Sequence, residues 1–128
     1  MLGTIFLFHL FLFHLFNFIR MRYTHRLPEL TFELGTIVFS PGIRAGLLSS
    51  SGLQPYLDHV LECHAATDFG IISRAMRFDN VLAALMDTGQ LTSRFFISPT
   101  ICPPETVVIV TTHLDERTTT IRFASEQL

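Results

Sequence analysis

In the middle of the chain, the apolar positions repeat with the period of an α-helix. The clearest stripe has spacings of i, i+3, i+4 and i+7 and consists of Leu57, Val60, Leu61 and His64. A shorter helix is predicted over 41–48, because Ser40 can cap its first turn and Pro41 fits its first position. A third helix is predicted over 73–86, and Gly89 follows it. Its inward residues are expected to be Met76, Val81, Leu82, Leu85 and Met86.

Segments typical of β-strands lie on both sides of these helices. Residues 34–39 predict a short strand before them, and residues 91–98 predict another after them. The strongest strand signal is VVIVTT at 107–112, whose lack of alternation predicts a central strand that is covered at least partly on both faces. Residues 118–123 follow after a short turn and should form an antiparallel hairpin with it. The three prolines in 99–105 predict a loop.

A strand, then helices, then an antiparallel meander predict an α+β domain whose helices pack on one face of the sheet. The chain has 128 residues, which suits one such domain. We expect the domain to span 34–128. Residues 21–33 include Pro28 and mix polar with apolar side chains, so they are expected to be an extended lead-in. Residues 1–20 differ in composition and are set apart as a leader.

The leader is a low-complexity apolar segment in which FLFHL occurs twice, at 6–10 and 11–15. A secretory signal peptide is disfavoured, because no positive residue precedes the apolar run and no small-residue cleavage site follows it. The run over 5–19 is shorter than the roughly 20 residues that a membrane-spanning helix needs. It also contains polar side chains that do not share one helical face, which disfavours an amphipathic surface helix: His9, His14 and Asn17.

Two interpretations of the leader remain. Met21 directly follows Arg20 at the end of the run, and translation from Met21 would make residues 1–20 a mis-assigned start. In the alternative, residues 5–19 form a short membrane anchor, and Arg20 and Arg22 hold the following domain on the cytoplasmic side. Both interpretations predict a cytoplasmic domain.

The charges of the chain disfavour nucleic acid as a partner. All nine basic residues are arginine, there are eleven acidic residues, and the formal net charge is −2. The arginines cluster only at Arg20, Arg22 and Arg26, whereas a surface that binds duplex DNA needs many clustered positive charges. The two cysteines, Cys63 and Cys102, are too few for a disulfide framework and are expected to be reduced.

One set of residues could bind zinc. His59 and Cys63 lie one helical turn apart, and Cys102 and His113 could complete four ligands. In the simpler interpretation, His59 is on the surface, Cys63 is in the core and His64 closes the helix. No second closely spaced ligand pair exists, so zinc is kept only as an alternative and no cofactor is expected.

Evidence for catalysis in the sequence is weak. Cys63, His113 and Asp115 could form a nucleophilic triad, but no glycine-rich turn that could bind an oxyanion accompanies Cys63. Motifs for phosphate or dinucleotide binding are missing from the sequence as well. An enzyme is therefore disfavoured.

The predicted turns carry the candidate binding residues. The closing hairpin gathers an acid, a base and hydroxyl groups at one end: Asp115, Arg117, Thr119 and Thr120. Asp68 lies in a second turn, before Gly70. The alternative to binding is turn chemistry, in which Asp115 accepts hydrogen bonds from the amides that follow it and pairs with Arg117, while Asp68 fixes its own turn.

Several blocks of the domain, in this order, are similar to one known family. They are LGTIV at 34–38, SPG at 40–42, LECH at 61–64, TDFG at 67–70, DN at 79–80, VIVTT at 108–112, then Asp115, Arg117, Thr119, Thr120, Ile121 and Glu126. They resemble a family of small bacterial proteins that are often carried on plasmids, some of them labelled as related to type I restriction–modification subunits. The chain departs from this pattern at Cys63, Thr67 and Phe69, where the family has arginine, glycine and tryptophan. The resemblance covers about residue 33 to the end and implies no established activity.

The sequence therefore favours a small soluble accessory protein of the plasmid-related type, which acts by binding a protein partner encoded near it. Two alternatives stay open. One is a cytoplasmic domain anchored in the membrane through residues 5–19, and the other is a small metal-binding or enzymatic protein that uses the histidines and cysteines named above.

Overall fold

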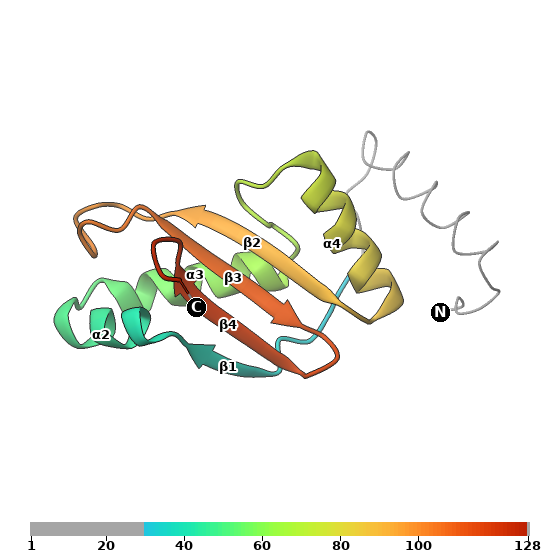
Figure 1. Ribbon diagram of the computed structural model, residues 1–128, viewed down its shortest axis with the longest axis horizontal. Helices are drawn as coiled ribbons and strands as arrows, with labels where there is room; N and C mark the ends of the chain where they lie inside the picture. Colours follow the sequence, from blue (N-terminus) through green and yellow to red (C-terminus); the bar gives the residue numbers. More distant parts are fainter. Residues whose placement is uncertain (1–29, 128) are drawn as a thin grey trace. The chain divides into compact units, whose positions relative to one another are not determined.

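A mixed four-stranded sheet organises residues 30–127, the part of the chain that this computed structural model describes (Figure 1). The strands are β1 (Thr36–Phe39), β2 (Gln90–Phe96), β3 (Val107–His113) and β4 (Thr118–Phe123), in the order β1-β4-β3-β2. The last three form an antiparallel meander, whereas β1 pairs with β4 in parallel. The predicted α+β class is thereby confirmed. The predicted leader, and the lead-in up to residue 29, lie outside the described residues.

The strand β1 approaches β4 closely where the closing hairpin turns. The N–H of Thr36 donates to the carbonyl of Arg117, and the N–H of Ser40 donates to that of Ile121, both at 3.0 Å. Gly35 comes just before the first of these bonds, with a φ of +68°. A Cβ at Gly35 would lie 2.1 Å from the Arg117 oxygen, so only glycine allows this pairing.

Three helices connect β1 with β2: α2 (Pro41–Ser49), α3 (Leu53–Ala65) and α4 (Arg74–Met86). The hydroxyl of Ser40 accepts a hydrogen bond from the N–H of Ile43, and that of Ser73 accepts one from Met76. Both serines therefore cap the helices that follow them. The bounds of α2 and α4 agree closely with the predicted ranges, because these start signals are local.

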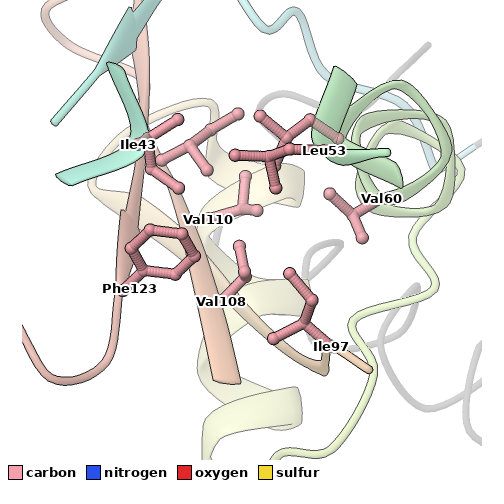
Figure 2. Packing of buried hydrophobic residues seen from close by; sticks show 9 residues of the cluster. Ile43, Leu53, Val60, Ile97, Val108, Val110 and Phe123 are labelled. Atoms are coloured by element: carbon pink, nitrogen blue, oxygen red, sulfur yellow. The ribbon is translucent and has the colours of Figure 1, made fainter. Parts of the chain in front are cut away.

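The main core lies between the layer formed by α2 and α3 and one face of the sheet (Figure 2). It consists of Ile43, Leu53, Leu57, Val60, Ile97, Val108, Val110, Ile121 and Phe123. Its members on β3 and β4 are two residues apart, because successive side chains of a strand point to opposite faces. As predicted, β3 is an interior strand, and Ile109 on its opposite face is also buried.

The helix α4 runs beside β2 and shares a second, smaller cluster with it (Figure 1). That cluster consists of Phe69, Leu91 and Leu114, with Phe32, Ile72, Ala83 and Ala84 packed against it. The predicted inward face of this helix was partly wrong. Val81 is buried as predicted, but Leu85 and Met86 are 37% and 58% exposed, and Asn80, which was not predicted to face inward, is buried. The physical reason is that α4 meets an edge of the sheet and buries only a narrow stripe.

Two segments cover the outer edge of β2. The side-chain amide of Asn80 makes the two hydrogen bonds that a neighbouring strand would make. Its Nδ2 donates to the carbonyl of Thr92 (2.8 Å), and its Oδ1 accepts from the Thr92 N–H (3.0 Å). The N–H of Ile71 donates to the carbonyl of Arg94 (2.7 Å), and the Arg94 N–H donates to Phe69 (3.1 Å). Unpaired strand edges invite pairing with other chains, and these contacts block that pairing.

A third contact covers the outer edge of β2, near the end of the strand. There the hydroxyl of Tyr56 on α3 donates to the carbonyl of Phe96. Burial raises the pKa of Tyr56 to about 12, and the nearby Cys63 adds to this effect. The hydroxyl therefore keeps its proton, and the bond to Phe96 persists over the physiological pH range.

The helix α3 ends in a Schellman motif, which normally places glycine at its left-handed residue. The N–H of Thr67 donates to the carbonyl of His64 (3.0 Å), and the N–H of Asp68 donates to that of Cys63 (2.8 Å). Thr67 has a φ of 65°, which is costly for a β-branched residue.

We expect Thr67→Gly to stabilise the protein by about 0.5–1 kcal/mol. Relief of the left-handed threonine gives roughly 1–2 kcal/mol, and the greater freedom of glycine in the unfolded chain removes part of this. Urea unfolding of the two proteins measures the difference. Ala66→Gly is the matched control, because Ala66 has a φ of −90° and glycine should not stabilise the chain there. A lower urea midpoint for Thr67→Gly would contradict the expected strain.

Candidate functional site

The residues predicted in the closing hairpin do not form one cluster. The carboxylate of Asp115 accepts hydrogen bonds from the hydroxyl of Thr88 (2.8 Å) and the N–H of Gly89 (3.1 Å). These bonds hold the pKa of Asp115 below its usual value. Asp115 was expected to bond to the amides that follow it and to pair with Arg117, and both expectations were wrong. It instead joins the hairpin to the turn between α4 and β2.

Arg117 and Asp68 also have local structural partners. Arg117 adopts a left-handed φ of 59°, and its guanidinium lies 3.4 Å from the carboxylate of Glu33, in an exposed ion pair. The N–H of Gly70 donates to the carboxylate of Asp68 (3.2 Å), as the turn interpretation predicts. Both charged groups remain on the surface, and only the Asp68 contact involves the backbone.

The two threonines of the predicted site point to opposite faces of the sheet. Thr119 is fully buried on the face that α3 covers, whereas Thr120 lies on the other face. They therefore cannot both belong to one surface of the sheet, because neighbouring residues of a strand alternate between the faces. Thr119 instead belongs to a buried network of hydrogen bonds.

This network is centred on the imidazole of His64 and joins α3 to three strands. His64 Nδ1 contacts the hydroxyl of Ser93, and Nε2 contacts the hydroxyl of Thr112 at 2.9 Å. Thr112 in turn contacts the hydroxyl of Thr119 at 2.7 Å, and Thr119 donates to the carbonyl of Leu34 at 2.7 Å. The network thus also reaches the segment just before β1.

The carbonyl of Leu34 fixes the direction of the bonds that lead to it from His64 Nε2. Because a carbonyl only accepts, Thr119 donates to it and must accept from Thr112. Thr112 therefore accepts from His64, so Nε2 carries a proton. Burial lowers the pKa of His64 to about 4, so the ring is neutral near pH 7, and its unprotonated Nδ1 accepts from Ser93.

A serine hydroxyl that donates to a histidine resembles part of a catalytic triad, but this pair is closed to substrates. Ser93 and His64 are both fully buried. The rings of Phe32 and Phe69 pack edge-on against the imidazole, with centroids 5.2 and 6.0 Å from its centre. The pair is therefore part of the core. A histidine within the apolar stripe was visible in the sequence, but its partners on distant strands were not.

The N-terminus of α2 is filled by the chain's own Glu126. Its carboxylate accepts hydrogen bonds from the hydroxyl of Ser40 (2.6 Å) and from the N–H groups of Gly42 (2.8 Å) and Phe123 (2.9 Å). Burial alone would raise the pKa of Glu126, but these bonds outweigh burial and lower it. This carboxylate occupies the place where a helix could bind an external anion.

The zinc ligands considered from the sequence are not brought together. The Nε2 of His59 lies 3.6 Å from the Sγ of Cys63 on the surface of α3. Cys102 packs instead against the main core, near Gly46 of α2. His113 lies on the sheet face that α3 does not cover. Within residues 30–127, no group of three His, Cys, Asp or Glu side chains could hold a metal ion.

The thiol of Cys63 is also poorly suited to be a nucleophile. Burial raises its pKa, and the nearby Asp68 and Glu62 raise it further. Reactive and metal-binding cysteines are thiolates, which need a lowered pKa. The triad of Cys63, His113 and Asp115 fails as well, because Asp115 is bonded to the α4–β2 turn.

The face of the sheet opposite the main core carries a mixture of charged, hydroxyl and apolar side chains. In Figure 1 this face is turned toward the viewer, α3 passes behind it, and no described helix crosses it. Two of its apolar side chains are open to solvent, Phe96 at 68% and Val38 at 42%. Its charged side chains are Arg94 and Arg122. We call this surface the open sheet face.

No protein-family model matches the chain, and comparison with curated proteins and with solved structures gives no significant match. Any functional argument therefore depends on the residues of the chain itself. The open sheet face is the candidate functional site, because the predicted turn residues and the buried histidine are explained by folding.

The stability of the protein should depend on pH through His64. Its pKa is about 4 in the folded chain and about 6.5 when exposed, so the unfolded chain binds more protons between these values. We expect the free energy of unfolding to fall by about 3 kcal/mol as the pH drops from about 7 to 4.

Urea unfolding of His64→Gln across this pH range checks the assignment. The variant should be less stable at pH 7 and should lose less stability on acidification, since glutamine does not titrate. His59→Gln on the exposed side of α3 should keep the wild-type dependence. Equal pH dependence in the wild type and in His64→Gln would exclude His64 as the cause.

Proposed function

We propose that the protein is a small cytoplasmic accessory protein of the plasmid-related type, which binds another protein encoded near it through the open sheet face. One observation carries the proposal. Among residues 30–127, the helices leave one face of the sheet uncovered, and Phe96 on that face exposes 68% of its surface. Exposed aromatic side chains on a flat surface are typical of binding sites between proteins.

The edges of the sheet support binding through its face. Three contacts close the outer edge of β2, from Asn80, from residues 69–71 and from Tyr56. At the opposite edge β1 has only four residues, and the guanidinium of Arg44 donates to its last carbonyl, that of Phe39 (2.6 Å). A partner that adds a strand needs a longer free edge, so the exposed side chains are the better contact.

The other interpretations are weaker on the described residues. Ser93 and His64 are the pair most similar to a catalytic site. Both are buried and cannot contact a substrate, so they do not support an enzymatic function. Within residues 30–127, no helix has the length and apolar character that crossing a membrane requires. The membrane anchor considered for residues 5–19 lies outside the described part of the chain.

Binding can be tested with the proteins encoded next to this chain, each purified and titrated against it by calorimetry. Phe96→Ser should weaken the complex by about 10- to 30-fold, as expected for an aromatic residue central to an interface. Its melting temperature should change little, because the side chain is exposed.

Leu48→Ser is the matched control for this experiment. Leu48 is 91% exposed on α2, which lies on the helical side of the sheet, so its loss should not change binding. Equal weakening by the two substitutions would place the interface elsewhere. If none of the neighbouring proteins binds, the proposed function is wrong.

A further inference from the structure

The four strands of the sheet contain arginine and histidine but no acidic residue. Their sequences are TIVF, QLTSRFF, VVIVTTH and TTTIRF. The two arginines, Arg94 and Arg122, and the histidine, His113, all belong to the open sheet face. The chain as a whole carries a net charge of −2, so this face differs in sign from the rest of the molecule.

The two arginines lie in one row across the sheet. Arg94 on β2 is opposite Ile109 on β3, and Ile109 is opposite Arg122 on β4. Neighbouring strands are about 4.8 Å apart, so the two arginine backbones are separated by about 10 Å. Ile109 is only 7% exposed between these long side chains, whose apolar stems can cover it.

The row keeps most of its hydrogen-bonding capacity free. Arg122 donates from one nitrogen to the carbonyls of Phe123 (3.4 Å) and Glu126 (3.1 Å). The charge of Arg122 helps to lower the pKa of Glu126, but that carboxylate is already bonded to Ser40, Gly42 and Phe123. Among the described residues, the salt bridge that is found joins Arg117 and Glu33. Arg94 forms no ion pair with any of these residues.

Polar and apolar neighbours extend the row in both directions. The adjacent row consists of Thr92, Thr111 and Thr120. Their hydroxyls make long contacts within the sheet, from Thr120 to the carbonyl of Thr111 and between Thr92 and Thr111, both at 3.5 Å. On the other side of Arg94, the exposed ring of Phe96 offers an apolar contact. A ligand for this surface therefore needs negative charges for the arginines and an apolar group for Phe96.

We propose that the open sheet face binds an acidic segment of a protein partner, with carboxylates at Arg94 and Arg122 and an apolar side chain against Phe96. This inference rests on the proposed function and names the chemistry of the partner. Arginine binds carboxylates through paired hydrogen bonds, and complementary charge directs the partner to this face. Two arginines on a chain of net charge −2 favour an acidic protein over a nucleic acid, which needs more clustered cations.

The test uses the isotope-labelled full chain and two synthetic peptides, followed by NMR titration. The first peptide alternates glutamate and phenylalanine over eight residues, and the second replaces each glutamate by glutamine. The acidic peptide should shift the amides around Arg94, Ile109 and Arg122 and bind at least tenfold more tightly than the neutral one. Binding of both peptides with equal affinity would overturn the role of charge.

Charge-neutral variants separate this inference from the proposed function. Arg94→Gln and Arg122→Gln should each weaken the acidic peptide about five- to tenfold, whereas Arg44→Gln on α2 makes the same change in net charge and should leave binding intact. If a neighbouring protein binds and is sensitive to Phe96→Ser but not to Arg94→Gln, the proposed function stands and the acidic partner is wrong.

A single-stranded 12-nucleotide DNA completes the experiment. It should shift the same amides less strongly than the acidic peptide does at equal salt. If the DNA binds more tightly and responds to Arg94→Gln, the open sheet face is a nucleic-acid surface and the inference is overturned.

Discussion

The buried imidazole of His64 is the constraint on which the arrangement of the layers depends. A polar ring in an apolar core is tolerated only when both of its nitrogens are hydrogen-bonded. Here Ser93 and Thr112 provide those bonds, and Thr119 extends them to the carbonyl of Leu34. A shift of one strand by one residue would move its hydroxyl to the other face and leave the imidazole unpaired. The network therefore specifies the register as well as stabilising the core.

The network also accounts for the division of the sheet into two different faces. The hydroxyls of Ser93, Thr112 and Thr119 point toward α3, so the next residues along each strand point away from it. Those outward positions include Arg94 and Thr120. The same alternation that completes the core thus places cations and hydroxyls on the open sheet face.

The two edges of the sheet are protected in different ways. A partner is therefore expected to contact the face of the sheet and not its edges. At β2, the edge is covered by a side chain, by a short piece of backbone and by a tyrosine hydroxyl. At β1, the strand has only four residues, and the guanidinium of Arg44 donates to its last carbonyl, that of Phe39. Glu126 adds a tie between the end of the described chain and the start of α2. Because other parts of the described chain contact these edges and the start of α2, the side chains of the open sheet face are the better candidates for recognition.

The helices and strands could be predicted from local signals in the sequence. The start signals at Ser40 and Ser73, the stripe that includes His64, and the closing hairpin all act over a few residues. The fold class and the turn role of Asp68 could be predicted as well. Three features became visible only in the folded chain: β1 pairs in parallel with β4, Asp115 bonds to the α4–β2 turn, and Thr119 is buried. These features join residues far apart in the chain, and no local period or spacing encodes such contacts. The open sheet face belongs to the same class, because a row of residues from three strands exists only once the strands have paired.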